Sequence, residues 1–439
     1  MNSDSKNKFI LLFLVILFLT LFLFYITTNI SEIMNVESIL GDNNSNNKLK
    51  HWKKEIYEPV GNIPINVFIG DANNDGFNDI VSANFRGHNI SILLWNQSSG
   101  NWKNHFELKT GWGPYSAVIG DANNDGYNDI VVSNWGSDDI SILLWNHTSM
   151  DWDYELRREV ESYPHSAVIG DVNDDGYNDI VTTNDYVDFI SILLWNSTIN
   201  DWDPQILIRV GDQPWNVFIG DANNDGYNDI IVPNLLDNSI SLIIWNSTIR
   251  EWNNMIEKEV GVLPYWVTLG DADNDGFNDI ITANYITNDI SIFLWHELAE
   301  DWAPEYRLAV MNNPKCVFIG DVDNDGFNDV IVSSFDNASI AIYLWNIENQ
   351  EWNPPIMMYL AGMPQTIFIG DANNDGYNDI VLDNSHTSSV IIILWRDQAK
   401  SRQIIPGYEL SIIIGVLWII SVVKIGRRIK KMRSSKFIL

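Results

Sequence analysis

Short apolar runs recur every 50 residues along residues 51–396, separated by polar segments rich in Asn, Asp and Gly. In the first unit the runs are Trp52 to Val60, Val67 to Gly70, Asp79 to Asn84 and Ile90 to Trp95. Each run is short, rich in Ile, Val and aromatic side chains, and without helical periodicity, so each is predicted to be a β-strand. Seven tandem units of four strands predict an all-β fold, a seven-bladed β-propeller with four-stranded blades.

The two ends of the array predict how the ring closes. The chain enters on the strand that begins at Trp52 and leaves after the strand from Val390 to Trp395. The last unit therefore lacks an outer strand, while the first unit has one to spare. We expect the Trp52 strand to join the last blade, because this pairing leaves no open sheet edge at the seam.

Most of the tryptophans occupy two repeated positions, one that opens the first strand of a unit and one that ends the fourth. The first set is Trp52, Trp102, Trp152, Trp202, Trp252, Trp302 and Trp352, and the second is Trp95, Trp145, Trp195, Trp245, Trp295, Trp345 and Trp395. Aromatic side chains fixed at strand positions are predicted to pack between strands and blades rather than to form a cofactor site.

An apolar segment, Phe9 to Ile26, precedes the array and follows Lys6 and Lys8. This order of charged and apolar residues is typical of a secretory signal peptide or a retained signal anchor, which we place at residues 1–28. Residues 29–50 are then a polar linker to the propeller.

A second apolar segment, Leu410 to Val423, follows the array and is succeeded directly by a cluster of Lys and Arg residues. This pattern predicts a juxtamembrane linker at 397–407, a transmembrane helix at 408–426 and a short basic cytoplasmic tail at 427–439. A terminal helix packed on the propeller is the alternative, but basic residues after an apolar segment favour a membrane span with a cytoplasmic tail. The propeller is therefore expected at the cell surface, outside the membrane.

Four N-x-S/T sequons begin at the same position of successive units, in the turn after the fourth strand. They start at Asn96, Asn146, Asn196 and Asn246. Glycosylation at these asparagines would agree with an extracellular propeller, although duplication of the unit would also copy them.

The net charge of the chain limits which kinds of molecule it is expected to bind. The formal net charge is −32, and much of it comes from Asp residues at fixed positions of one loop per unit. A nucleic-acid partner is not expected, because binding phosphates needs a basic face that the repeats lack. The single cysteine, Cys316, excludes a disulfide within the chain and is expected to be a buried small apolar residue.

Every unit carries a D-x-[N/D]-x-D-G-x-x-D loop between its second and third strands. Calcium binds about six to eight hard oxygen ligands, and alternate loop positions can face one centre when a Gly permits a sharp turn. The loops are therefore predicted to bind up to seven Ca²⁺ ions, which would change the formal net charge from −32 to −18. Simple polar turns are the alternative, but they do not explain why positions one, five and nine are always Asp.

The predicted calcium ligands are the side chains at loop positions one, three, five and nine and the backbone carbonyl at position seven. Loop by loop they are Asp71, Asn73, Asp75, Phe77, Asp79; Asp121, Asn123, Asp125, Tyr127, Asp129; Asp171, Asn173, Asp175, Tyr177, Asp179; Asp221, Asn223, Asp225, Tyr227, Asp229; Asp271, Asp273, Asp275, Phe277, Asp279; Asp321, Asp323, Asp325, Phe327, Asp329; and Asp371, Asn373, Asp375, Tyr377, Asp379. The spacing matches the first nine positions of an EF-hand loop, but these loops join strands instead of helices.

The segment from Gly70 to Asp79, GDANNDGFND, followed by an apolar strand resembles the FG-GAP/VCBS repeat of the integrin α-subunit β-propeller and of many surface proteins. The resemblance covers residues 51–396 and implies a seven-bladed propeller with calcium in hairpin loops on its lower face. Such propellers serve adhesion receptors, lectins and enzyme-attached domains, so the resemblance specifies fold and metal more closely than function. A short-tailed single-pass FG-GAP protein is a nearer match than an integrin α-subunit with its further extracellular domains.

Two stretches vary freely among the units, residues 61–66 and 85–89 in the first unit and their equivalents in the others. Successive loops of an antiparallel sheet point to alternate ends, so these two stretches are expected on one face and the calcium loops on the other. Aromatic residues collect in the variable stretches, and such residues are enriched in binding hot spots. The predicted ligand-binding residues are Trp112, Tyr115, Trp135, His165, Trp215, Tyr265 and Trp266. The alternative is that these side chains merely cover the ends of the blades.

The sequence therefore predicts a calcium-stabilised, membrane-anchored extracellular recognition or adhesion protein with a protein or glycan ligand. A multivalent lectin with similar pockets between its blades is the alternative. An enzyme is not expected, because the seven His are scattered over different repeat positions and the repeated Asp are assigned to calcium.

Overall fold

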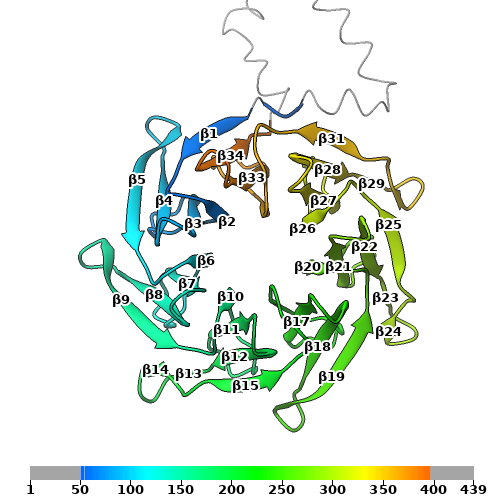
Figure 1. Ribbon diagram of the computed structural model, residues 1–439, viewed down its shortest axis with the longest axis horizontal. Helices are drawn as coiled ribbons and strands as arrows, with labels where there is room; N and C mark the ends of the chain where they lie inside the picture. The colour runs from blue at the N-terminus through cyan, green and yellow to red at the C-terminus, as the bar shows by residue number, and fades with distance from the viewer. Residues whose placement is uncertain (1–50, 54, 396–439) are drawn as a thin grey trace, which may run out of the picture.

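The computed structural model describes residues 51–53 and 55–395, which form a ring of seven antiparallel four-stranded sheets (Figure 1). The predicted seven-bladed β-propeller is therefore confirmed. The segments predicted at 1–50 and 397–439, including the signal segment and the transmembrane helix, lie outside the described residues. No helix in the described part of the chain has the length and apolar character that crossing a membrane requires.

The blades are numbered by their inner strands in chain order, and each is given from inner to outer strand. Blade 1 contains β2 (Pro64–Gly70), β3 (Asp79–Asn84), β4 (Asn89–Asn96) and β5 (Asn101–Lys109), and blade 2 contains β6 (Pro114–Gly120), β7 (Asp129–Asn134), β8 (Asp139–Asn146) and β9 (Asp151–Glu159). Blade 3 contains β10 (Pro164–Gly170), β11 (Asp179–Asn184), β12 (Phe189–Leu193) and β15 (Ile206–Arg209), and blade 4 contains β16 (Phe218–Gly220), β17 (Asp229–Asn234), β18 (Ser239–Asn246) and β19 (Glu251–Glu259). Blade 5 contains β20 (Pro264–Gly270), β21 (Asp279–Asn284), β22 (Asp289–Phe293) and β25 (Tyr306–Ala309), and blade 6 contains β26 (Pro314–Gly320), β27 (Asp329–Ser334), β28 (Ser339–Tyr343) and β31 (Ile356–Tyr359). Blade 7 contains β32 (Ile367–Gly370), β33 (Asp379–Asn384), β34 (Ser389–Ile393) and β1 (Ile56–Pro59).

Three blades carry a separate two-stranded hairpin before the outer strand. These hairpins are β13 (Trp195–Asn196) with β14 (Asp201–Trp202), β23 (Trp295–His296) with β24 (Asp301–Trp302), and β29 (Trp345–Asn346) with β30 (Glu351–Trp352).

The ring closes where the two ends of the array meet. Strand β1 pairs antiparallel with β34, with Ile56 opposite Ile392, and Trp52 forms a further bridge to Trp395. The rings of Trp52 and Trp395 also contact each other edge to face, with centroids 5.1 Å apart. The predicted closure is confirmed, and the two segments lie side by side although the whole array separates them in sequence (Figure 1).

The two middle strands of each blade are buried, because both faces of these strands pack against other strands and neighbouring blades. Ile80, Ile90 and Ile92 of blade 1 are 0% exposed. Cys316 is also fully buried, as its sequence position predicted. A glycine ends each inner strand where neighbouring blades approach most closely. A Cβ atom added to Gly220 would lie 2.7 Å from Leu269 of the next blade.

Two inner strands are shorter than the others, and each has a local cause. In blade 4 the carbonyl of Pro233 faces β16 and accepts the Trp215 N–H (3.2 Å), but proline has no N–H with which to continue the ladder. In blade 7 the buried Asp383 carboxylate accepts the backbone N–H groups of Gln365 (2.9 Å) and Thr366 (2.6 Å), which replaces ladder bonds before β32.

Candidate functional site

Each D-x-[N/D]-x-D-G-x-x-D loop closes around its first aspartate. In blade 1, Asp71 accepts the Asp75 N–H at Oδ1 (3.0 Å) and the Gly76 N–H at Oδ2 (2.8 Å). Gly76 has a φ of 88°, which a residue with a Cβ adopts only under strain. The equivalent glycine has a positive φ in all seven loops, so the same turn gathers the carboxylates in every blade.

The ninth loop residue ties the loop to the rest of its blade. Asp79 is fully buried and accepts the Ala72 N–H at Oδ2 (3.1 Å) and the Trp95 N–H at Oδ1 (2.8 Å). Trp95 in turn packs against Trp102 with ring centroids 4.9 Å apart. The same contacts recur around the ring, which confirms the predicted packing role of the repeated tryptophans.

Burial changes the protonation of the ninth-position aspartates. Burial raises the pKa of Asp79 to about 7 and that of Asp329 to about 8, and the other five aspartates at this position reach about 7 for the same reason. No ion pair found within the described ranges includes any of them. A buried carboxylate without a cation is costly, so this geometry favours a bound positive ion.

The remaining ligand positions supply oxygen atoms of the kind that hard cations prefer. In blades 5 and 6, Asp271, Asp273 and Asp275, and likewise Asp321, Asp323 and Asp325, bring carboxylate oxygens within 4.8 Å of one another. The other five loops have Asn at position three, where its Oδ1 also accepts the N–H of position five. The donor set therefore fits a divalent metal ion in each loop.

At the opposite end of the inner strands, a row of aromatic side chains crosses blades 2 to 5. The ring centroids of Tyr115 and His165 are 3.6 Å apart, those of His165 and Trp215 are 3.8 Å apart, and those of Trp215 and Tyr265 are 5.0 Å apart. The structure thus brings four of the predicted ligand-binding residues into contact. We call this end of the propeller the aromatic end, and the end with the Asp loops the loop end.

Three residues of the aromatic row, Tyr115, His165 and Trp215, line a small central cavity. Residues of all seven blades, on the inner strands or directly before them, line a cavity of about 30 Å³ at the centre of the ring, which has room for about one water molecule. Residues 65 and 66 and most of their equivalents were expected in a variable loop, and that expectation is wrong. They lie on the inner strands, which begin at Pro64, Pro114, Pro164, Pro264 and Pro314 in blades 1, 2, 3, 5 and 6. Their side chains differ from blade to blade while facing one shared cavity.

Blades 6 and 7 contribute polar residues to the same cavity, and the sequence analysis missed them. Lys315 Nζ lies 5.0 Å from the Tyr265 ring centroid and donates to Gln365 Oε1 (2.9 Å). Burial raises the pKa of the nearby Asp383 to about 7, and the positive charge of Lys315 opposes that rise. Burial and Lys315 also hold the pKa of His165 well below its usual range, so His165 is neutral. Lys315 and Gln365 occupy the repeat position of Tyr115, so comparing the units at that position would have found them.

The other predicted ligand-binding residues lie around this central row. Trp135 contacts Tyr163, with centroids 4.7 Å apart, and Tyr163 contacts Tyr186 (4.8 Å). Trp112 is 64% exposed. Trp135 and Trp266 are half-buried, and Trp266 differs from the others because it packs against the hydrophobic cores of the neighbouring blades while lining the central cavity.

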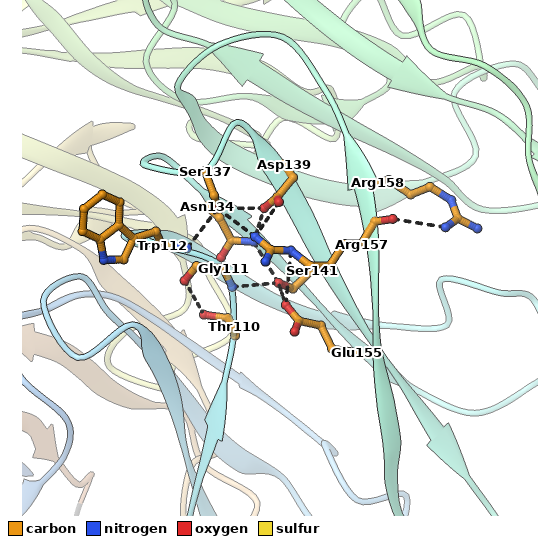
Figure 2. Close-up of polar contacts among 10 residues, drawn as sticks. All are labelled: Thr110, Gly111, Trp112, Asn134, Ser137, Asp139, Ser141, Glu155, Arg157 and Arg158. Carbon is orange, nitrogen blue, oxygen red and sulfur yellow. Dashed lines mark hydrogen bonds and ion pairs between the residues drawn. The ribbon is translucent and has the colours of Figure 1, made fainter.

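A polar network fixes the loop that carries Trp112 (Figure 2). Ser137 Oγ accepts the Trp112 N–H (2.9 Å), and Arg157 donates to the same oxygen (2.8 Å) while pairing with Asp139. Trp112 also donates its indole N–H to His88 Nε2 (2.7 Å). The exposed indole is therefore held in one orientation before any partner binds.

The four sequon asparagines begin the hairpins at the loop end. The side chain of Asn146 accepts the Thr148 N–H (2.7 Å), and that of Asn246 accepts the Thr248 N–H (3.1 Å). The hairpin residues that follow are exposed. Glycosylation of these asparagines stays a prediction.

Comparison with protein families agrees with the repeat geometry. A family model described as FG-GAP-like repeat matches residues 42–132, 171–232, 271–332 and 321–382, which together exceed half of the chain. A search of curated protein sequences found no match.

Solved structures with similar architecture share little sequence with this chain. A crystal structure of BBS1N in complex with ARL6DN, soaked with lead, has a TM-score of 0.54 at 12% identity and covers 79% of this chain and 98% of that one. The same complex soaked with mercury has a TM-score of 0.53 at 12% identity, over 79% and 99% of the two chains. Hydrazine synthase from Kuenenia stuttgartiensis has a TM-score of 0.52 at 10% identity, over 77% and 97%. At these identities the likeness concerns the fold alone.

Proposed function

This chain belongs to the FG-GAP-like repeat family, and on that premise we propose that it is a calcium-stabilised recognition protein. Its ligand, a protein or a glycan, binds at the aromatic end of the propeller. The observation that carries the proposal is the row of contacting aromatic side chains across blades 2 to 5, flanked by exposed and pre-oriented rings.

Calcium is the ion that we propose for the Asp loops. Each loop offers side-chain oxygens at positions one, three, five and nine and a carbonyl at position seven, and calcium prefers such an all-oxygen set. The bound ion supplies the positive charge that offsets the buried ninth-position carboxylate. In this proposal the metal stabilises the blades, and the ligand binds at the other end.

The aromatic end has the composition of a binding surface. Trp112 and Tyr186 are each 64% exposed, although burial of such rings contributes strongly to association. Arg157, Asp139 and Ser137 hold the Trp112 loop, so little conformational entropy is lost when a partner binds.

Replacing Trp112 and Tyr186 together by alanine is expected to weaken ligand binding by about tenfold or more, because each removes a large exposed ring from the surface. Binding of the purified protein to cells and to a glycan array, in calcium, measures the effect. Tyr359→Ala is the matched control, since Tyr359 is 74% exposed but lies on the outer strand β31. Equal binding by the wild type and the folded double variant would exclude the aromatic end, and glycan-array signals would separate sugar ligands from protein ligands.

A lectin with equivalent pockets between blades is the second candidate. A groove of about 520 Å³ between blades 3 and 4, lined by Trp245, Trp252 and Arg250 among others, favours it. The residue at the repeat position of Arg250 differs in the other units, however: Gly100, Met150, Asn200, Glu300 and Gln350. This variation argues against seven identical sugar sites.

We propose a location at the cell surface, with the propeller outside the membrane and the basic tail inside. The apolar segment at 408–426, the basic residues after it and the sequons at Asn96, Asn146, Asn196 and Asn246 support this topology. The proposed role is binding without catalysis, since the repeated carboxylates are assigned to metal and His165 is neutral and enclosed by aromatic rings.

The proposal predicts that stability falls with rising pH in the metal-free protein and changes little with pH in excess calcium. In the metal-free protein, burial raises the pKa of Asp79 to about 7, so its contribution to stability is present at low pH and is lost as the pH rises through 7. Calcium keeps the carboxylate ionised in the folded protein, and in the unfolded chain it is already ionised above pH 5, so in excess calcium stability is nearly constant over the same range. Melting temperatures at pH 5, 6, 7 and 8, in excess calcium and in a calcium chelator such as BAPTA, measure both slopes. Parallel slopes in the two series would contradict the assignment of calcium to these carboxylates.

A further inference from the structure

Hydrogen bonds between asparagine side chains and backbone groups join neighbouring Asp loops around the ring. We call this set the asparagine belt, and it consists of the asparagines at loop positions four and eight. They are Asn74, Asn78, Asn124, Asn128, Asn178, Asn224, Asn228, Asn274, Asn278, Asn324, Asn328, Asn374 and Asn378. Position four of the third loop is Asp174.

Each complete link of the belt contains three hydrogen bonds. Asn74 Nδ2 donates to the Asn128 carbonyl (3.0 Å), and the Asn128 N–H donates back to Asn74 Oδ1 (2.7 Å). Asn128 Nδ2 then donates to the carbonyl of Asp71 (2.9 Å), which is loop position one of the preceding blade. An amide side chain suits this role because it offers a donor and an acceptor to the same peptide group.

The same three bonds recur at six of the seven seams, with lengths of 2.7–3.1 Å. The seam that closes the ring is one of them, because Asn374 Nδ2 donates to the Asn78 carbonyl (3.0 Å). The belt therefore continues across the closure.

The belt is interrupted between blades 3 and 4. A carboxylate has two acceptor oxygens and no donor. Where an asparagine would donate to the Asn228 carbonyl, Asp174 offers only another acceptor, and two acceptors form no hydrogen bond. Of the three belt bonds, the described residues at this seam keep only the third, from Asn228 Nδ2 to the Asp171 carbonyl (2.8 Å). Asp174 and Asn228 are both exposed, whereas Asn74 and Asn128 are half-buried.

The inner strands show a second difference at the same seam. At four seams a side chain at or beside the inner strand of one blade accepts an N–H of the next blade, as Asn66 does from Ala117 (3.0 Å) and Ser116 from Ala167 (2.9 Å). Within the described residues no such bond joins β10 to β16, and blades 3 and 4 are bonded instead by Thr183 Oγ1 to the Trp215 carbonyl (3.2 Å) and by Arg250 to the Asp174 carbonyl (3.4 Å). The seams after Trp266 and Cys316 also lack the bond between inner strands, but they keep the complete belt. The groove of about 520 Å³ lies between blades 3 and 4.

We propose that the asparagine belt couples the metal loops of neighbouring blades, and that its interruption at Asp174 makes the seam between blades 3 and 4 the place where the ring opens. The coupling part rests on the proposed calcium binding. Belt positions four and eight adjoin ligand positions five and nine, so an ion that orders one loop also fixes the groups that bond to the next. Coupling passes around six seams and stops at the seventh.

Two reciprocal substitutions test the proposal. Asp174→Asn supplies the missing amide, and Asn124→Asp creates the same interruption between blades 2 and 3. In the full-length protein with chelator, Asp174→Asn is expected to slow hydrogen exchange in segments 171–178 and 214–228 roughly tenfold, because two hydrogen bonds are gained. Asn124→Asp is expected to speed exchange in segments 121–128 and 164–178 by a similar factor. Unchanged exchange in both variants would overturn the proposal.

A third variant separates the effect of the belt hydrogen bonds on exchange from the effect of backbone conformation. Asn124 has a φ of 58°, which asparagine tolerates better than aspartate, so Asn124→Asp changes more than hydrogen bonds. Asn124→Gly keeps a residue that accepts this φ and removes only the amide. Faster exchange in Asn124→Gly supports the belt, whereas slower exchange would assign the effect to backbone preference and overturn it.

Calcium titration by calorimetry distinguishes this inference from the proposed function. We expect a steeper isotherm for Asp174→Asn and a shallower one for Asn124→Gly than for the wild type. No calcium binding in any of the proteins would overturn the proposed calcium function and the coupling with it. Calcium binding with identical isotherms and identical exchange in all of them would overturn the asparagine belt alone.

Discussion

With calcium bound as proposed, its removal from the propeller is expected to lower the melting temperature by about 10 °C or more, since every blade would lose a stabilising ion. At a free concentration one hundred times the dissociation constant, each site contributes about 2.7 kcal/mol. Without the ion, the carboxylates of Asp71, Asp75 and Asp79 face one another with no cation to balance them. Thermal unfolding followed by circular dichroism in calcium and in chelator measures the change.

Asp75→Asn is the single-site control for this experiment. Asp75 is exposed and its Oδ1 accepts the Phe77 N–H (3.0 Å), a bond that an asparagine oxygen can keep. The variant should melt at the wild-type temperature in chelator and below it in limiting calcium. An equal melting temperature of the wild type with and without chelator would show that the Asp loops do not depend on an ion.

Replacing Ile56-Tyr57-Glu58-Pro59 by Gly-Ser-Gly-Ser is expected to lower the melting temperature by about 10 °C or more and to cause aggregation. These residues form β1, the only described strand that joins the start of the array to β34. Their loss leaves the edge of blade 7 unpaired and uncovers apolar residues such as Ile392.

Replacing Met357-Met358-Tyr359 of β31, two half-buried residues and one exposed residue, by Gly-Ser-Gly is a comparison, because it weakens one outer strand without touching the closure. Size-exclusion chromatography and thermal unfolding compare the two variants. A closure variant that stays monomeric and melts with the wild type would mean that β1 does not hold the ring together.

The ring and its closure follow from local sequence features, which explains why they could be predicted. The 50-residue period fixes the blade, and the strand left over at Trp52 has one possible neighbour, the edge near Trp395. The Asp loops are equally local, since Asp71 to Asp79 fold onto themselves with bonds such as Gly76 N–H to Asp71.

The composition of the central cavity was not predictable in the same way. Tyr115, Lys315 and Gln365 share one repeat position but come from different blades, so their meeting in one cavity is apparent only when the units are compared around the closed ring. The interruption at Asp174 is a second example, because Asp and Asn are both common in such loops. The difference between Asp and Asn at position 174 affects only the hydrogen bonds to the peptide group of Asn228 in the next blade.

The offset between the sequence unit and the blade has a consequence for how such proteins can change size. Each 50-residue unit begins with the strand that forms the outer strand of the preceding blade. The second unit, for example, begins with β5, which is the outer strand of blade 1. Gain or loss of one whole unit by recombination therefore leaves every sheet with four strands, and the strand at Ile56–Pro59 still meets the last blade. Blade number can drift during evolution while the seam, the loops and the belt positions stay intact.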